Sequence, residues 1–217
     1  MTPNTIASAF APLEQLASQL IPHIPREDDA SHDISHTLRV WKNARTIQAI
    51  EGGDLTILVP SILLHDCAAV EKDSPFRFQA SRHAADKASK LLREQGFSAS
   101  AIESVAHAIE AHSFSANVPP RTLEAKIVQD ADRLDAIGMI GVARCFHLAG
   151  RLRRSLYDVD DPRGRNRPHD DKKFAVDHFD TKLLKLASGF QTAAGRSLAR
   201  PRHERLVRYL DELFEEI

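Results

Sequence analysis

Histidine is unusually frequent in this chain, and several of the histidines occur near aspartates. The chain has 11 histidines, and six of them lie between His32 and His112. Imidazole binds metals and transfers protons near neutral pH. Three segments combine the residue types that ligate divalent metals: SHDISHTLRVW (31–41), LLHDCAAVEK (63–72) and KIVQDADRLDAIG (126–138). These segments are where a metal site or a proton-transfer site is to be sought.

The first segment predicts a polar stripe on one helix face. Spacings of four, three and four residues place its side chains on that face: His32, His36, Arg39 and Asn43. A stripe of this kind also forms simply by facing water, so it does not establish a site by itself.

The other two segments place acids at the end or on the face of a helix. His65 and Asp66 end a strongly apolar helix, which would hold two ligand-type side chains on a buried scaffold. An ordinary polar helix end explains this pair as well. Asp132 and Asp135 share one helix face, whereas Asp130 lies on another side.

The elements that position these residues are predicted to be helices. Apolar residues recur at helical spacing almost throughout, and no segment alternates convincingly with period 2. We expect an all-α fold of about ten helices, over about residues 4–20, 32–50, 54–66, 78–95, 102–109, 123–134, 137–155, 174–187 and 202–216. Asp54 is the expected N-cap of the third helix, and Pro60 is expected to kink that helix or move its start. The polar stretch 158–173 is expected to be a solvated loop, whose arginines would also suit the mouth of a site for anionic ligands.

Composition narrows the class of protein. A chain of 217 residues with 42% hydrophobic and 27% charged residues is typical of a soluble globular protein. A net charge of −1 gives no basic field for nucleic acid or an anionic membrane. No apolar stretch approaches a membrane span, and no secretory signal is evident. Cys67 and Cys145 are too few for a disulfide framework, so we expect reduced core cysteines in a cytoplasmic protein.

The order of the three segments resembles a known family. A histidine, a His-Asp pair about 30 residues later and an aspartate inside A-D-R-L-D resemble the HD-domain superfamily of metal-dependent phosphohydrolases. The segments HDISHTLRVW, LLHD, AIEAHSFS, EAKIVQDADRLDAIG and DHFDTKLLKL resemble its small bacterial YedJ-like and YpgQ-like branch. The resemblance covers about residues 25–195. It implies a single HD domain over 1–217, with a core at about 25–150 and a C-terminal helical extension at about 151–217 packed on it.

The resemblance implies one divalent metal ion, held by His36, His65, Asp66 and Asp132. Two imidazoles and two carboxylates suit Mn, Fe, Co, Ni or Zn, whereas Mg prefers more oxygen ligands. Mn is the favoured ion. Four protein ligands on a six-coordinate ion leave positions for a water and a phosphate oxygen, so the ion would activate the water and offset phosphoryl charge.

Further residues are assigned roles near that ion. Arg39 and Lys72 are expected to contact phosphate, although a surface ion pair would also account for Arg39. Glu71 is expected to orient the attacking water, with a solvated helix-end acid as the alternative. Asp33 and Asp135 are expected to orient ligand histidines. Substrate contacts are expected from Arg39, His112, Arg144, His178 and Lys182. The last three lie in family-like segments, and an ordinary core or surface position is the alternative for each.

The resemblance implies a metal-dependent phosphohydrolase of nucleotides, and we expect a monomer or homodimer with no nucleic-acid or membrane partner. The resemblance favours a (deoxy)nucleoside triphosphate as substrate, with release of pyrophosphate. Two alternatives remain open. One is a nucleoside monophosphatase or cyclic-nucleotide phosphodiesterase of the same superfamily, and the other is a non-catalytic nucleotide-binding regulatory module.

Overall fold

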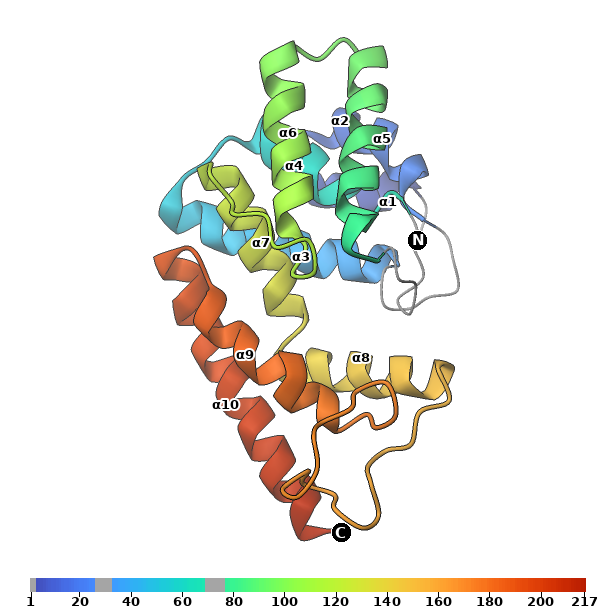
Figure 1. Cartoon of the computed structure of the whole chain (residues 1–217). Helices are drawn as coiled ribbons and strands as arrows, with labels where there is room; N and C mark the ends of the chain where they lie inside the picture. The colour runs from blue at the N-terminus through green and yellow to red at the C-terminus, as the bar shows by residue number, and fades with distance from the viewer. Residues whose placement is uncertain (1–2, 26–32, 69–76) are drawn as a thin grey trace. The chain divides into compact units, whose positions relative to one another are not determined.

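The computed structural model describes residues 3–25, 33–68 and 77–217. Over these residues the protein has ten α-helices, short 3-10 segments, one π-helical segment and no β-strand (Figure 1). The predicted all-α class is therefore confirmed. None of the described helices is long and apolar enough to cross a membrane. The chain divides into two compact units, Met1–Asp132 and Arg133–Ile217.

The first unit contains six helices and most of a seventh. Their bounds are α1 (Pro3–Ala7), α2 (Glu14–Leu20), α3 (Ile34–Glu51), α4 (Leu55–Leu64), α5 (Ala80–Glu94), α6 (Ala99–His112) and α7 (Leu123–Asp135). Three 3-10 segments accompany them: Ser8–Phe10, Ile21–His23 and Arg77–Gln79. Helices α5 and α6 lie side by side, and α4 contacts α2, α3 and α6 (Figure 1).

Helix α4 is the apolar centre of the first unit, and its last eight side chains are all buried. The Asp54 carboxylate caps it as predicted, accepting a hydrogen bond from the Thr56 amide at 2.8 Å. Pro60 does not move the start of the helix, because a proline inside a helix removes only one backbone donor. The His-Asp pair therefore follows a rigid, buried helix.

The single helix predicted over residues 4–20 is wrong, because the structure has two helices there, α1 and α2, with a 3-10 turn between them. Pro12 accounts for the break, since it has no amide hydrogen and restricts the preceding residue. Trp41 of α3 anchors this turn. Its indole N–H donates to the Ala9 carbonyl at 2.7 Å, and its ring stacks on Phe10 with centroids 4.9 Å apart.

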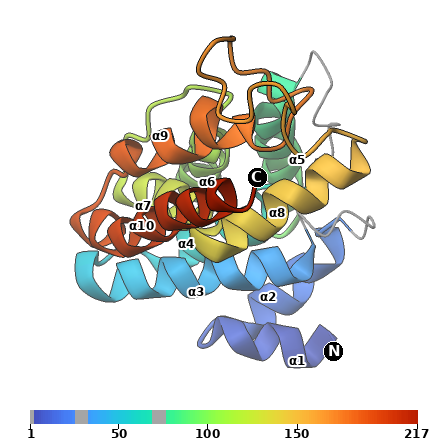
Figure 2. The ribbon, with the colours of Figure 1, turned by 90° about the horizontal axis from the view of Figure 1, so that it is seen from below.

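The second unit contains α8 (Gly138–Arg151), a π segment (Phe179–Leu183), α9 (Leu184–Leu186), a 3-10 segment (Ala187–Gly189) and α10 (Ala193–Glu215). Helices α8 and α10 pack against each other (Figure 2). The rings of Phe146, Phe179 and Tyr209 lie within 6.1 Å of one another, centroid to centroid, and join α8, the π segment and α10. Both cysteines of the chain are buried and free, as predicted.

Helix α10 begins nine residues before the predicted start at 202. The hydroxyl of Thr192 accepts a hydrogen bond from the Gly195 amide at 2.9 Å, which is the geometry of an N-cap. The predicted start lies just after Pro201, whereas the structure places that proline inside the helix. The cap and the helix-favouring residues before Pro201 outweigh the loss of one backbone donor.

Replacing Thr192 by alanine is expected to lower the free energy of unfolding by about 1 kcal/mol, because the first turn of α10 then loses its side-chain cap. Urea unfolding followed by circular dichroism measures this. Thr192→Ser is the matched control, since it keeps the hydroxyl and should retain most of the stability. Equal losses in both variants would contradict a capping role.

The stretch 158–173 has no α-helix or β-strand, as predicted, but it is not simply solvated. Arg167 donates through Nη2 to Oδ1 of Asp177 at 2.9 Å, and its Nε lies 3.1 Å from a carboxylate oxygen of Asp158. The Arg167 guanidinium also covers the Phe174 ring at 4.6 Å. One arginine thus ties both ends of the loop together, and Asp177 beneath it is only 1% exposed.

Candidate metal centre

Three elements of the first unit bring the four predicted metal ligands together. His36 comes from the first turn of α3, His65 and Asp66 follow α4 directly, and Asp132 lies in the last turn of α7. His36 and His65 are almost completely buried, whereas the side chains of Asp66 and Asp132 are 21% and 25% exposed. The cluster is therefore buried on the imidazole side and open to solvent on the carboxylate side.

The separations between these groups suit a shared ion. Nε2 of His36 lies 3.2 Å from Nε2 of His65, 3.8 Å from Oδ2 of Asp66 and 3.5 Å from Oδ1 of Asp132. Nε2 of His65 lies 3.3 Å from the same oxygen of Asp66. One ligand atom from each of His36, His65 and Asp66 lies within 4.8 Å of the others. Ligands about 2.0–2.2 Å from one ion are spaced in this range.

Capping and cross-helix contacts hold α3 in place. The Asp33 carboxylate accepts from the His36 amide at 2.9 Å and from the Ser35 hydroxyl at 2.7 Å. Asp33 therefore caps α3 and orients the backbone of His36 instead of bonding to an imidazole. The buried Asn43 donates to the Ala131 carbonyl at 3.0 Å, which connects α3 to α7 next to Asp132. The predicted stripe had included Asn43 without assigning it this positioning role.

Two imidazoles are oriented by the helices that precede them. Nδ1 of His65 lies 2.7 Å from the Ile62 carbonyl, and Nδ1 of His112 lies 2.6 Å from the Ile109 carbonyl. Each Nδ1–H donates to a carbonyl oxygen, so Nε2 carries the lone pair in the neutral ring. Nε2 of His112 is 3.8 Å from Oδ1 of Asp66. The structure thus brings His112, a predicted substrate contact, to the edge of the cluster.

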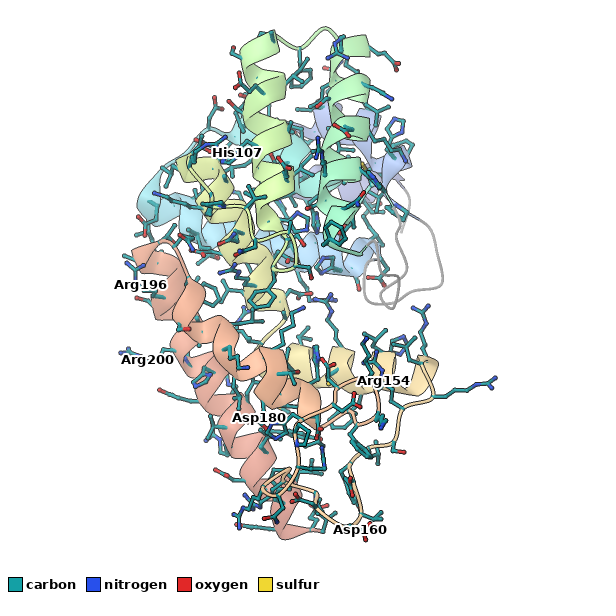
Figure 3. All side chains as sticks on the ribbon, viewed as in Figure 1. His107, Arg154, Asp160, Asp180, Arg196 and Arg200 are labelled. Carbon is teal, nitrogen blue, oxygen red and sulfur yellow. The ribbon has the colours of Figure 1, made fainter. Side chains whose placement is uncertain are left out.

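His107 does not join this cluster, because residues five positions apart on a helix face different sides of it. Nε2 of His107, which Figure 3 labels on α6, instead accepts a hydrogen bond from the Arg121 amide at 2.9 Å. A further contact holds the end of α6. Gln129 of α7 donates to the Ala111 carbonyl at 2.6 Å, immediately before His112. Sequence reasoning had not identified Gln129, because its partner lies 18 positions away.

The electrostatics of the cluster favour a positive charge. Burial opposes protonation of His65, but the charge of Asp66, a hydrogen bond to it and the charge of Asp132 raise the pKa of His65 to about 9. Burial and the neighbouring His65 lower the pKa of His112. Burial works against ionisation of Asp132, but the adjacent His112, His36 and His65 hold its pKa below the usual range. The Asp132 carboxylate is therefore ionised, which favours a cation beside it.

The residues of the cluster fit a divalent ion. The Nε2 atoms of two buried imidazoles lie 3.2 Å apart, and the carboxylates of Asp66 and Asp132 face them. A divalent cation would take the place of the proton that His65 otherwise carries and would offset the negative charge of the carboxylates. The mixed nitrogen and oxygen set matches borderline divalent metals better than it matches Mg.

Metal binding is expected to weaken as the pH falls, because the ion must displace the proton from His65. Its pKa of about 9 means that the imidazole is protonated at neutral pH in the absence of metal. For one displaced proton, affinity should fall by about tenfold per pH unit below that value. Competition with a chelator at pH 6, 7 and 8, corrected for chelator protonation, measures the slope. An affinity independent of pH would contradict the electrostatic account of the cluster.

The remaining predicted site residues lie in several places. Arg39 is half-buried and donates to the Ser35 hydroxyl at 3.0 Å.

Asp135 and Arg144 pair with each other in the second unit, with Nη1 of Arg144 2.7 Å from the Asp135 carboxylate. Asp135 is 1% exposed. Its carboxylate, which was predicted to orient a ligand histidine, is bonded to Arg144 instead. Glu71, Lys72 and His32 lie outside the described residues. His178 and Lys182 belong to the second unit.

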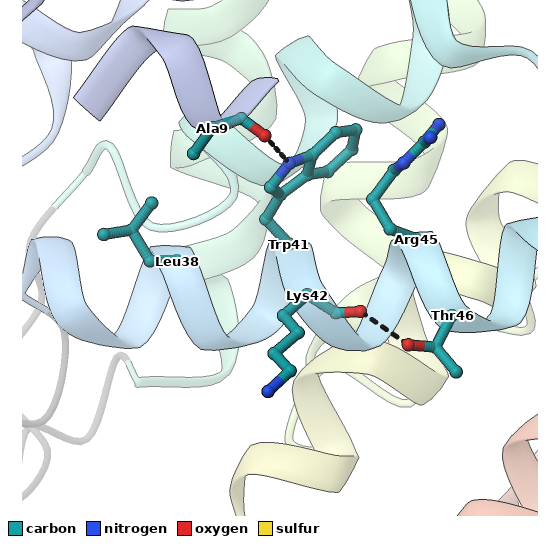
Figure 4. Close-up of a pocket in the computed structure, with 6 residues that line it drawn as sticks. All are labelled: Ala9, Leu38, Trp41, Lys42, Arg45 and Thr46. Atoms are coloured by element: carbon teal, nitrogen blue, oxygen red, sulfur yellow. Dashed lines mark hydrogen bonds between the residues drawn. The ribbon is translucent and has the colours of Figure 1, made fainter. Parts of the chain in front are cut away.

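A separate pocket of about 520 Å³ lies beside α3 (Figure 4). It is lined by Ala9, Leu38, Trp41, Lys42, Arg45 and Thr46. The Arg45 guanidinium lies 5.7 Å from the centre of the Trp41 ring. Among the residues that the structure describes, no predicted site residue, imidazole or carboxylate lines this pocket.

Comparison with known proteins identifies the family. The HD domain family model matches residues 33–137. The chain is 31% identical to the uncharacterized protein YpgQ of Bacillus subtilis over 201 residues, 91% of this chain and 90% of that one. The crystal structure of B. subtilis YpgQ in complex with ADP matches with a TM-score of 0.68 at 29% identity, covering 100% of this chain and 97% of that one.

Two further crystal structures agree with this assignment. An HD-superfamily hydrolase from Bacillus thuringiensis is 30% identical, with a TM-score of 0.70 over 99% of this chain and 98% of that one. A protein from Lactobacillus plantarum is 28% identical, with a TM-score of 0.73, and the match covers 100% of this chain and 98% of that one. The chain belongs to the HD-domain superfamily and is a YpgQ-like HD-superfamily hydrolase.

Proposed function

We propose that this protein is a divalent-metal-dependent phosphohydrolase that acts on nucleotides. The observation that carries the proposal is the convergence of two buried imidazole Nε2 atoms with the carboxylates of Asp66 and Asp132. The relationship to HD-superfamily hydrolases supports hydrolysis. The ADP complex of B. subtilis YpgQ supports a nucleotide as the ligand.

In the proposed mechanism, His36, His65, Asp66 and Asp132 hold the ion. When bound, the ion lowers the pKa of a water molecule and offsets negative charge on the phosphoryl group. The carbonyl of Ile62 keeps Nε2 of His65 available as a ligand atom. The exposed side of the two carboxylates leaves an approach for the substrate.

His112 is suited to a different role in this mechanism. It is buried, its pKa is lowered, and its Nδ1–H is committed to the Ile109 carbonyl. At neutral pH it is therefore an uncharged hydrogen-bond acceptor at Nε2, 3.8 Å from Asp66. We assign it to contact with the substrate or with the attacking water. Arg39 is assigned to a phosphate oxygen, and the proposal keeps Lys72, Glu71 and Asp135 as further catalytic candidates.

Within this proposal the substrate is a (deoxy)nucleoside triphosphate, the products are the nucleoside monophosphate and pyrophosphate, and Mn is the favoured ion. The two-imidazole, two-carboxylate set supports a borderline metal over Mg. We keep one HD domain over the whole chain, in a monomer or homodimer, as part of the proposal.

The test is to measure bound metal in the purified protein and then to assay a nucleotide panel with Mn, Mg, Co and Ni. Phosphate and pyrophosphate are quantified separately. Pyrophosphate release from triphosphates with Mn supports the proposal. Release of phosphate from monophosphates, or opening of cyclic nucleotides, would assign a different reaction in the same superfamily. Nucleotide binding without hydrolysis under any metal would overturn the enzymatic assignment.

A further inference from the structure

Much of the candidate centre is built on the C-terminal ends of two helices. His65 and Asp66 directly follow α4, and His112 is the last residue of α6. The carbonyls in the last turn of an α-helix have no partner within the helix, so side chains or solvent must satisfy them. Both imidazoles do part of this, because each Nδ1–H donates to the carbonyl three residues earlier. The position of each of these site residues therefore depends on how its helix ends.

One buried carboxamide holds the end of α6. Nε2 of Gln129, on α7, donates to the Ala111 carbonyl at 2.6 Å, one residue before His112. Ala111 is 0% exposed, so bulk water cannot take the place of this donor. Gln129 also lies three residues before Asp132 on the same helix. A single side chain thus connects the helix that carries Asp132 to the helix that ends in His112.

The oxygen of the same carboxamide lowers stability. Gln129 is 2% exposed, and its Oε1 has no hydrogen-bond partner among the residues that the structure describes. Burying an amide oxygen without a donor is unfavourable. An apolar side chain of similar size, such as methionine, would avoid that loss. Glutamine at this position is therefore explained by the hydrogen bond of its Nε2 to the end of α6, and not by the stability of the core.

A lysine holds the chain after α4 in a similar way. Nζ of Lys87, on α5, donates to the Cys67 carbonyl at 2.8 Å, one residue after Asp66. One turn earlier on α5, the Ala84 carbonyl accepts a hydrogen bond from the Cys67 thiol at 3.4 Å. Helix α5 carries none of the four predicted metal ligands. It nevertheless fixes the residue next to Asp66 at two points.

Asp66 depends on this placement because its carboxylate lies among three imidazoles. Its Oδ2 is 3.3 Å from Nε2 of His65 and 3.8 Å from Nε2 of His36, and its Oδ1 is 3.8 Å from Nε2 of His112. A displacement of the backbone at Asp66 would change all three separations together. Residues that hold metal ligands in place typically alter metal affinity or activity by about 10- to 100-fold when they are replaced.

We infer that Lys87 and Gln129 are positioning residues of the candidate centre. Lys87 acts on Asp66 and Gln129 acts on His112, each through the neighbouring main-chain carbonyl. The assignment rests on the proposed function, in which Asp66 is a metal ligand and His112 contacts the substrate or the attacking water. The two roles are separable for that reason. Loss of the Lys87 contact weakens metal binding, whereas loss of the Gln129 contact slows turnover.

Gln129→Met tests the contact with α6. The variant removes the donor together with the unpartnered Oε1, so the free energy of unfolding should change little. The value of kcat at saturating metal and substrate should fall about tenfold, and the metal affinity measured by chelator competition should stay the same. A wild-type kcat, or a loss of stability that parallels the loss of activity, would overturn the role of Gln129.

Gln48→Met is the matched control for this variant. Nε2 of Gln48 also donates to a main-chain carbonyl, that of Gly53 at 3.4 Å, but beyond the C-terminal end of α3. His36 lies in the first turn of the same helix, about three turns away. Gln48→Met should therefore keep the wild-type kcat. An equal fall of kcat in both variants would show that any lost carboxamide contact slows turnover, and would contradict a specific role.

Lys87→Met is expected to weaken metal binding about tenfold, and Lys87→Arg, which keeps a charged donor, should recover most of the affinity. Lys90→Met removes the same charge from another exposed position of α5 and should bind metal as the wild type does. Unchanged affinity in Lys87→Met, or equal losses in Lys87→Met and Lys90→Met, would overturn the role of Lys87.

A measurement without metal or substrate separates this inference from the proposed function. In the metal-free full chain with 15N-labelled histidine, Gln129→Met should shift the His112 signals, assigned with His112→Gln, and Gln48→Met should leave them unchanged. If these shifts occur and the wild type hydrolyses no nucleotide, the proposed function fails and the positioning of His112 stands. If the wild type hydrolyses nucleotides and Gln129→Met changes neither the His112 signals nor kcat, the inference fails and the proposed function stands.

Discussion

Replacing Asp132 by alanine is expected to abolish both metal binding and hydrolysis. Asp132 contributes the carboxylate from α7, with Oδ1 3.5 Å from Nε2 of His36, and it is one of the two carboxylates facing the buried imidazoles. Its loss removes a ligand and half of the carboxylate charge that attracts the ion. We expect activity to fall by at least about 1,000-fold, equivalent to about 4 kcal/mol of transition-state stabilisation.

The measurements are metal content per chain after dialysis and turnover of the best substrate at saturating metal. Asp86→Ala, at an exposed position of α5, is the matched control and should behave as the wild type. Asp132→Asn separates charge from shape, since it keeps the volume and loses the charge. Full metal occupancy together with full activity in Asp132→Ala would refute the proposed centre.

Replacing Arg167 by alanine is expected to destabilise the protein by about 3–5 kcal/mol, the usual cost of removing one partner of a buried ion pair. Asp177 is 1% exposed and is bonded by the Arg167 guanidinium and the Asp170 amide. Without Arg167, the charge of Asp177 stays buried, and of these two donors only the Asp170 amide still bonds to it. The guanidinium also covers the Phe174 ring, so some packing is lost as well.

Urea unfolding of the wild type and the variant gives this difference in free energy. Arg165→Ala removes an equal charge from an exposed position of the same loop and should change stability by less than about 0.5 kcal/mol. A second variant, Arg167→Met with Asp177→Leu, removes both charges and should recover part of the loss. If Arg167→Ala were as stable as Arg165→Ala, the loop would not depend on this ion pair.

The helices and their caps could be predicted from the sequence, because they depend on residues that are close together along the chain. Helical periodicity predicted the all-α class, and Asp54 was recognised as a cap because its partner lies two residues away. Prolines were harder to interpret. Pro12 interrupts a predicted helix, whereas α10 continues through Pro201, because the cost of one lost donor depends on the surrounding packing and capping.

The pairing of distant side chains required the tertiary structure. Asp135 was predicted to orient a histidine, but helix packing places it against Arg144. The contact of His178 with Asp171 was hidden in a stretch expected to be solvated, since only the folded loop brings the two together.

The sequence by itself determined the helices, because apolar periodicity is a local property, and the order of its histidines and aspartates carried the resemblance that implied the metal ligands. Only the tertiary structure decided that His36, His65 and Asp132 meet at one point and that His112 joins them. The physical reason is that these side chains are separated by 20 or more residues. Their distances are set by how buried helix faces pack and by contacts such as that of Asn43 with the Ala131 carbonyl.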